Sequence, residues 1–214
     1  MPILYLIILS TLLIIILQLG IFGIVLAKLG LSPDSAVLLF VSTLLGSFIN
    51  LPLFTINSSS EEFIKNYPVP RSLFNPIPVL KGKTIVALNV GGALIPICFS
   101  LYLITLHSVV AIQFIPAIMI VAIISYIFSR PVKGLGIGIP IFIAPVSAAL
   151  SALIITPEHS APLAYICGTL GVLIGADIFR LKDIKKIGAP VASIGGAGTF
   201  DGIFFTGIIA VLLA

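Results

Sequence analysis

The sequence predicts an all-α membrane protein with about seven transmembrane helices, some of them broken by Pro or Gly. Hydrophobic residues make up 59% of the 214-residue chain and charged residues only 8%, whereas a soluble domain carries about 25% charged residues. Several windows of about 18 or more residues also lack acids and bases, which is long enough for a helix to cross a hydrocarbon core of roughly 30 Å. We therefore expect a multi-pass protein of the cell membrane, surrounded by the lipid bilayer.

Charged and turn residues divide the apolar sequence into seven predicted spans. The expected spans are residues 2–27, 35–56, 84–106, 108–129, 134–156, 162–179 and 189–214. The first is interpreted as a retained span, because no basic residue precedes it and its apolar run exceeds the roughly 7 to 15 residues of a secretory signal. Together the spans form one predicted transmembrane domain, 1–214, with a polar loop at 57–83.

The loop at 57–83 is predicted to fold back on the membrane surface or on the helical bundle. Its four prolines argue against a continuous helix. Its Phe, Ile and Leu residues argue against a free linker.

Lysine and arginine determine the predicted orientation. Ten of the eleven basic residues fall in the loops after the second, fourth and sixth spans, and only Lys28 falls on the opposite side. The positive-inside rule then places the N-terminus in the cytoplasm and the C-terminus outside. Because membrane topology accounts for these residues, the net charge of +4 does not indicate nucleic acid as a partner.

Two acidic residues lie within predicted spans, Asp177 in the sixth and Asp201 in the seventh. A carboxylate at the bilayer centre costs about 2.5 to 3.5 kcal/mol on insertion scales, so such residues are usually functional. Both are expected toward the cytoplasmic half, on an antiparallel helix pair that lets them face each other. The structural alternative for Asp177 is a surface ion pair with Arg180, three residues further along.

The structural alternative for Asp201 is an N-cap of the last helix. The segment after Asp201 would extend only about 20 Å as a helix, which is too short to cross roughly 30 Å. The stretch GGAGTFDG, Gly195 to Gly202, is therefore expected at membrane depth, buried in protein or lining water. Its glycines either let the chain unwind around an ion or let helices pack closely.

Asn89 is the third candidate ligand, because the NVGG segment that it opens and the nearby Pro96 mark a span expected to bend. Pro140 and Pro145 each free a backbone carbonyl in another span. Hard cations prefer such carbonyl and carboxylate oxygens. We therefore predict a metal site formed by Asp177, Asp201 and Asn89 for a divalent cation such as Ca²⁺ or Mg²⁺, with Na⁺ or a proton as alternatives.

Two short connections carry other titratable residues. His107 separates the third and fourth spans, and Glu158 and His159 lie in the external loop after the fifth. An exposed Glu-His pair is usually solvated surface, and a metal or proton contact is the alternative. Since no HExxH, CxxC, P-loop or Ser-His-Asp arrangement is present, any catalysis would depend on the two aspartates.

The segments GADIFRL (Gly175 to Leu181) and SIGGAGTFDGIFFTG (Ser193 to Gly207) resemble the C-terminal signature of an uncharacterised family. This family comprises archaeal and bacterial multi-pass membrane proteins known only as a domain of unknown function. The resemblance extends over most of the chain. It implies a fold of several helices and carries over two motif aspartates, Asp177 and Asp201, without an assigned activity.

The two aspartates are also similar to those of intramembrane aspartyl proteases of the presenilin and signal peptide peptidase type. Those proteases carry one Asp on the sixth span and a second in a Gly-x-Gly-Asp motif on the seventh. The present chain departs from that pattern, because Phe200 precedes Asp201 and no Tyr precedes Asp177. The resemblance implies a catalytic dyad in which one carboxyl is protonated and the other activates water.

Three functions follow from these patterns. The favoured one is cation handling by a channel or carrier, since broken helices, glycines, amides and acids occur together without a complete catalytic motif. The alternatives are an aspartyl protease with Asp177 and Asp201 as the dyad, and a structural membrane protein. An enzymatic activity is therefore not the leading expectation. Because a cation pore forms more easily between subunits, a homo-oligomer is expected.

Overall fold

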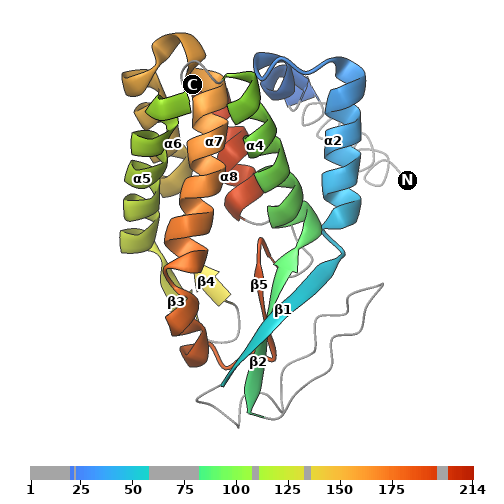
Figure 1. Ribbon diagram of the computed structural model, residues 1–214, viewed down its shortest axis with the longest axis vertical. Helices are drawn as coiled ribbons and strands as arrows, with labels where there is room; N and C mark the ends of the chain where they lie inside the picture. The colour runs from blue at the N-terminus through green and yellow to red at the C-terminus, as the bar shows by residue number, and fades with distance from the viewer. Residues whose placement is uncertain (1–19, 22, 58–81, 108–110, 133–135, 197–201) are drawn as a thin grey trace, which may run out of the picture.

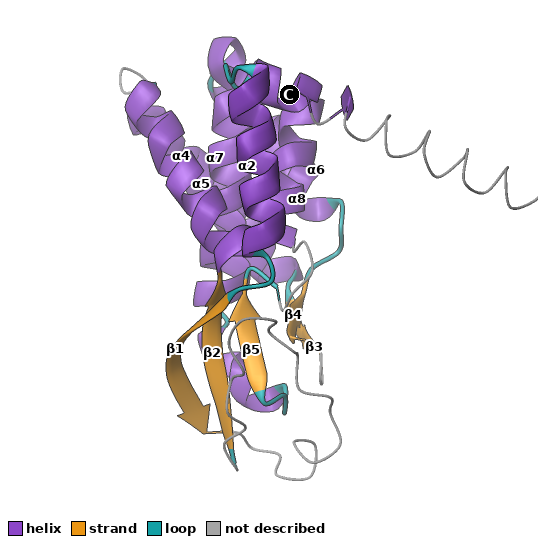
Figure 2. Ribbon diagram, turned by 90° about the vertical axis from the view of Figure 1, so that its right-hand side faces the viewer, coloured by secondary structure: helices purple, strands orange, loops and turns teal. Residues whose placement is uncertain are grey.

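The computed structural model describes residues 20–21, 23–57, 82–107, 111–132, 136–196 and 202–214. A helical bundle carries a small three-stranded sheet at one end (Figures 1 and 2). The α-helices are α2 (Pro33–Gly46), α4 (Ile95–Leu106), α5 (Ala111–Phe128), α6 (Ile143–Ile155), α7 (Ser160–Val172) and α8 (Gly202–Leu213). The strands are β1 (Asn50–Asn57), β2 (Lys83–Asn89), β3 (Arg130–Val132), β4 (Gly136–Gly138) and β5 (Val191–Ile194).

Four short helical segments extend or join these elements. Two are π-helical, η1 (Val90–Leu94) before α4 and η4 (Leu173–Ile178) after α7. Two are 3₁₀ turns, η3 (Pro157–His159) before α7 and η5 (Leu181–Lys186) after η4. The end of the bundle that meets β1, β2 and β5 is called the sheet end below, and the opposite end the distal end.

Helix α7 is the centre of the bundle. Eleven of its thirteen residues are buried, and it packs against α4, α5, α6 and α8. Small residues allow this close packing, since a Cβ added at Gly168 would lie 3.2 Å from Thr206 and 3.3 Å from Ala148. A helix covered on all sides needs no polar face, which explains why this stretch is apolar all round.

The three-stranded sheet has the order β1-β2-β5. Strands β1 and β2 are antiparallel from the pair Asn50 and Asn89 to the pair Asn57 and Lys83. Strand β5 lies parallel to β2, on its other side. The central strand β2 is mostly buried and the edge strand β1 mostly exposed. A second sheet, β3 with β4, connects α5 to α6.

The prediction of an all-α protein is wrong. Strands overlap four of the predicted spans: β1 overlaps 35–56, β2 84–106, β4 134–156 and β5 189–214. The runs that became β2 and β5 are short, buried and rich in β-branched residues. Hydropathy alone does not distinguish such a strand from a buried helix, so four helices were predicted too long.

The prediction of about seven transmembrane helices is wrong for the same reason. Among the described residues one helix, Pro157–Ile178, is long and apolar enough to cross a membrane, and 72% of its most apolar window is buried inside the protein. Helices α2, α4, α6 and α8 have 12 to 14 residues, which corresponds to about 18 to 21 Å. Most of the predicted first span and of the loop at 57–83 lies outside the described residues.

Candidate functional site

Two π-helical segments lie where the bundle meets the sheet. Asn89 immediately precedes η1, and Asp177 lies within η4. Segments of this kind are rare and often occur at functional sites. Both motifs noted in the sequence, NVGG and GADIFRL, therefore coincide with breaks in regular helix.

Asn89 is fully buried and joins three segments. Its Nδ2 donates to the Ser47 carbonyl at 2.7 Å and to Asn50 Oδ1 at 3.1 Å. Its Oδ1 accepts from the Gly92 amide at 2.6 Å, which caps the first turn of η1. The Asn89 side chain thus holds the end of α2, the start of β1 and η1 together.

Asn50 extends this network to the third strand. Its Oδ1 accepts a second hydrogen bond, from Ser193 Oγ at 2.6 Å. Asn50 is also buried, and Ser193 lies on β5. Side chains from β1, β2 and β5 are therefore connected in one hydrogen-bonded chain across the sheet, with each bond made in a largely water-excluded place.

Glycines let the backbone approach closely beside this network. A Cβ on Gly92 would overlap the Gly195 carbonyl, and one on Gly195 would lie 2.6 Å from the Ala93 amide nitrogen. Gly195 also has a φ of +82°, which favours glycine. Gly195 thus forms a turn after β5 that packs against the backbone of η1, whereas the two roles predicted for these glycines were unwinding around an ion and close packing of helices. Asn50, Asn89, Gly92, Ser193 and Gly195 are called the glycine–amide junction below.

Asp177 lines a small cavity beside this junction. The cavity has a volume of about 90 Å³, well above the roughly 10 to 15 Å³ that one water needs. Its wall comes from β4, η4, η5 and β5, and consists of Gly136, Ile137, Asp177, Ile184, Ile187, Val191, Ala192, Ser193, Ile194 and Gly196. Asp177 and Ser193 supply the polar side chains of this wall. Ser193 therefore connects the Asp177 cavity with the Asn89 network.

Arg180, the alternative partner predicted for Asp177, forms an ion pair with Asp183 at 3.0 Å. Its Nη2 donates to the carbonyls of Tyr126 at 2.7 Å and Ser129 at 2.9 Å, and its guanidinium lies 4.3 Å from the centre of the Tyr126 ring. These carbonyls end α5, where a cation is favoured. Arg180 thus ties the η4–η5 connection to α5.

Asp183 joins Arg180 in holding the η4–η5 connection to α5, an arrangement called the clamp below, and it was not predicted from the sequence. It also pairs with Lys186 at 2.6 Å. Hydrogen bonds from Lys186 and then Arg180 hold the pKa of the Asp183 carboxyl below its ordinary value. The three-residue spacing of Arg180, Asp183 and Lys186 was the signal in the sequence that pointed to a shared helix face.

Asp201 lies outside the described residues, so the proximity of Asp177 and Asp201 stays a prediction. Within the described part of the chain, no group of three or more His, Cys, Asp or Glu side chains lies in a position to hold a metal ion. The described portion of the predicted site is Asp177 at the cavity and Asn89 in the network behind it.

The distal end brings two histidines together. His107 follows α4 and His159 ends η3, and their ring centroids lie 5.3 Å apart with the planes tilted by 53°. Partial burial, and then the positive charge of His159, lower the pKa of His107. The sequence placed each histidine in a short loop but did not pair them. The signal was that both loops follow spans ending on the same side.

The chain was also compared with known proteins. A family model described as a protein of unknown function (DUF1614) matches residues 44–213. No curated protein and no solved structure matches the chain. The match covers both π-helical segments, the glycine–amide junction and the Asp177 cavity, and it confirms the resemblance to an uncharacterised family. The chain belongs to the DUF1614 family.

Proposed function

We propose that this protein handles cations in the cell membrane, as a channel or carrier, and that Asp177 binds the cation. The observation that carries the proposal is the Asp177 cavity. A carboxylate lies in a small, partly polar space, at a π-helical break that ends the central apolar helix. Carboxylates placed among apolar helices usually mark ion or substrate sites.

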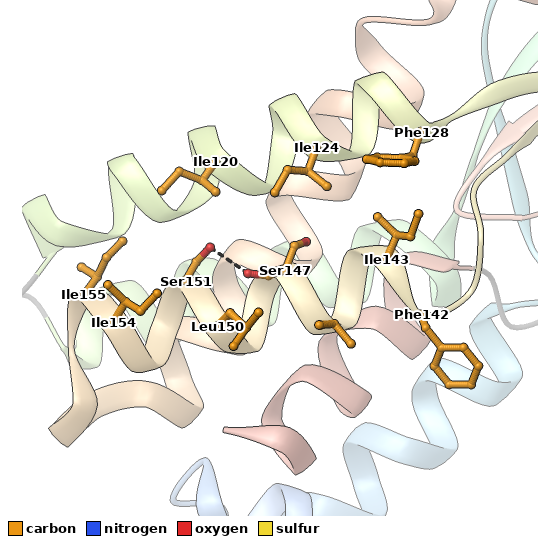
Figure 3. A pocket seen from close by; sticks show the side chains of 11 residues that line it. Ile120, Ile124, Phe128, Phe142, Ile143, Ser147, Leu150, Ser151, Ile154 and Ile155 are labelled. Carbon is orange, nitrogen blue, oxygen red and sulfur yellow. Dashed lines mark hydrogen bonds between the residues drawn. The ribbon is translucent and has the colours of Figure 1, made fainter.

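The surface of the bundle supports a membrane location. Large apolar side chains are exposed along α5 and α6, including Ile112 at 78% and Ile154 at 79%. An apolar groove of about 560 Å³ runs between the two helices, with Ile120, Ile124 and Phe128 facing α6 (Figure 3). Contiguous apolar surface of this kind indicates contact with lipid or another protein.

Even the polar groups in this groove are directed into their own helix. Ser147 Oγ donates to the Ala144 carbonyl at 2.9 Å. Ser151 Oγ donates to the Ser147 carbonyl at 2.7 Å (Figure 3). Hydroxyl groups bonded to their own helix backbone add little polarity to the surface. The groove therefore suits hydrocarbon, such as a lipid chain, better than water.

The described basic residues are distributed unequally between the two ends of the bundle. At the distal end, Lys28 Nζ donates to the Val211 carbonyl at 3.3 Å. The other described basic residues lie at the sheet end: Lys83, Arg130, Arg180, Lys182, Lys185 and Lys186 (Figure 1). The positive-inside rule then favours a sheet end that faces the cytoplasm. The Asp177 cavity would open on that side.

Oxygen ligands favour a hard cation such as Ca²⁺ or Mg²⁺ at this cavity. Asp177 would supply the charge and the Ser193 hydroxyl a neutral oxygen ligand, since both residues line the cavity. Asn89 acts through Asn50, which accepts the hydrogen bond from Ser193. Asp201 is retained as a second carboxylate. Assembly of several copies around the site, as a homo-oligomer, is part of the proposal.

The test is cation flux in liposomes that contain the purified protein. We expect Asp177→Asn to lower the flux of Ca²⁺ or Mg²⁺ at least tenfold, because the cation loses its charged ligand while the side-chain shape is kept. If the flux falls because the protein binds the cation tenfold more weakly, the lost binding free energy is about 1.4 kcal/mol. Ser193→Ala should weaken cation binding less, since it removes a neutral donor.

Asp34→Asn is the matched control. Asp34 lies in the first turn of α2, at the distal end and away from the cavity, so this variant should transport as the native protein does. Equal flux and equal cation binding in Asp177→Asn and the native protein would refute the proposal. Cleavage of a membrane peptide by the native protein, lost in Asp177→Asn, would instead favour the aspartyl protease.

A further inference from the structure

We propose that His107 and His159 form a second metal site, at the distal end, for a transition-metal ion of the Zn²⁺ class. These are the two histidines of the entire chain. They are 52 positions apart in the sequence, yet their rings lie against each other. The α4–α5 and α6–α7 connections that carry them lie at the opposite end of the bundle from the end of α7, which η4 and Asp177 follow (Figure 1). The site does not depend on the function proposed for the Asp177 cavity.

The ring separation fits one ion held by both imidazoles. A Zn–N bond of about 2.0 to 2.1 Å, with about 1.1 Å from nitrogen to ring centre, places each centroid about 3.2 Å from the ion. A tetrahedral angle then separates two such centroids by about 5.2 Å, whereas a right angle gives about 4.5 Å. The observed 5.3 Å is therefore a separation at which one Zn²⁺ can be bound by both imidazoles.

The imidazoles are chemically available for this role. In the part of the chain that the structure describes, the ring nitrogens of both His107 and His159 have no hydrogen-bond partner. Both side chains are half-buried, so the ion would have protein on one side and water on the other. Neutral imidazole is the form that binds metal. Water would complete the coordination.

A bound ion would join two connections that the backbone leaves separate. His107 belongs to the α4–α5 connection and His159 to the α6–α7 connection. A metal that bridges them would hold α4 against the start of α7 at the distal end. The structural consequence is a higher melting temperature with Zn²⁺ than without it.

The test is Zn²⁺ titration of the purified, tag-free protein in detergent, followed by calorimetry and by the melting temperature. We expect one Zn²⁺ per chain and a melting temperature that rises with Zn²⁺. His107→Gln and His159→Gln should each weaken Zn²⁺ binding at least tenfold and abolish the rise. The double variant should be little worse than either single one, because both imidazoles hold the same ion.

The controls separate this site from the Asp177 cavity and from general loss of structure. Asp177→Asn should bind Zn²⁺ as the native protein does, and His107→Gln should keep native cation flux. Each histidine variant should melt near the native temperature in the presence of chelator. Native Zn²⁺ affinity in either variant would overturn the proposal, as would two independent sites of which each variant removes one.

Discussion

The two ends of the bundle are built by different means. At the sheet end, the backbone at Gly92 and Gly195 is in direct contact, and Asn89 is hydrogen bonded through both its donor and its acceptor. At the distal end, His107 and His159 meet only through their rings. Backbone contacts hold the sheet end in one conformation whether or not a ligand is bound. At the distal end, two imidazole groups are available to bind a ligand. Identical substitutions at the two ends should therefore have very different costs.

The largest difference is expected for glycine to alanine. Gly92→Ala places a Cβ on the Gly195 carbonyl, and backbone atoms on both sides must move to accommodate it. We expect a loss of about 3 kcal/mol or more in the free energy of unfolding. Chemical unfolding in detergent micelles measures this quantity.

The matched substitution is Gly23→Ala, in the helical turn before α2, where an added Cβ meets nothing within 4 Å. It should be neutral or stabilise by up to about 1 kcal/mol, because alanine favours helix over glycine. Equal unfolding free energies for the two alanine variants would show that the Gly92–Gly195 contact does not constrain the sheet end.

The next effect concerns buried hydrogen bonds. Asn89→Leu removes three hydrogen bonds and leaves the Ser47 carbonyl and the Gly92 amide without that partner. We expect a loss of about 2 to 3 kcal/mol. At the distal end, Thr105→Ala removes an exposed bond to the Tyr102 carbonyl and should cost less than about 0.5 kcal/mol. A similar loss of unfolding free energy in Asn89→Leu and Thr105→Ala would indicate that water replaces the hydrogen bonds of Asn89.

The contrast also explains which parts of the molecule the sequence predicts. Helices α5 and α6 lie within predicted spans and most of α7 does, because long apolar runs mark helices well. The strands were missed because VASI at β5 and TIVAL in β2 are as apolar as the helices that follow them. The partner that makes each a strand lies far away in the chain, so local sequence carries little of that signal.

The candidate site shows the same limit. Charge in an apolar setting identified Asp177, and the structure places it at a cavity. Asn89 was selected as a ligand from its place before two glycines, while the structure shows its hydrogen bonds to Ser47, Asn50 and Gly92. Ser193, the residue that connects the two, opens the SIGGAGTFDGIFFTG segment but was not selected as a ligand. Its role depends on β5 lying beside β2, which only the tertiary structure reveals.

The smallest predicted effect is a pH dependence confined to the sheet end. The Lys186 and Arg180 hydrogen bonds lower the pKa of Asp183 from its ordinary 3.8, so near that pH the folded state binds fewer protons than the unfolded chain. The stability that Asp183 contributes is then fully present above about pH 4 to 5 and is lost as the pH falls through the folded-state pKa. We expect this contribution to stay below about 1 kcal/mol, because the Lys186 side chain is 69% exposed and water screens the pair.

The test compares the unfolding free energies of the native protein and Asp183→Asn between pH 7 and 3. The two values should converge at the acid end of this range. A constant difference across that range would show that ionisation of Asp183 does not contribute to stability, and would remove the electrostatic part of the clamp on α5.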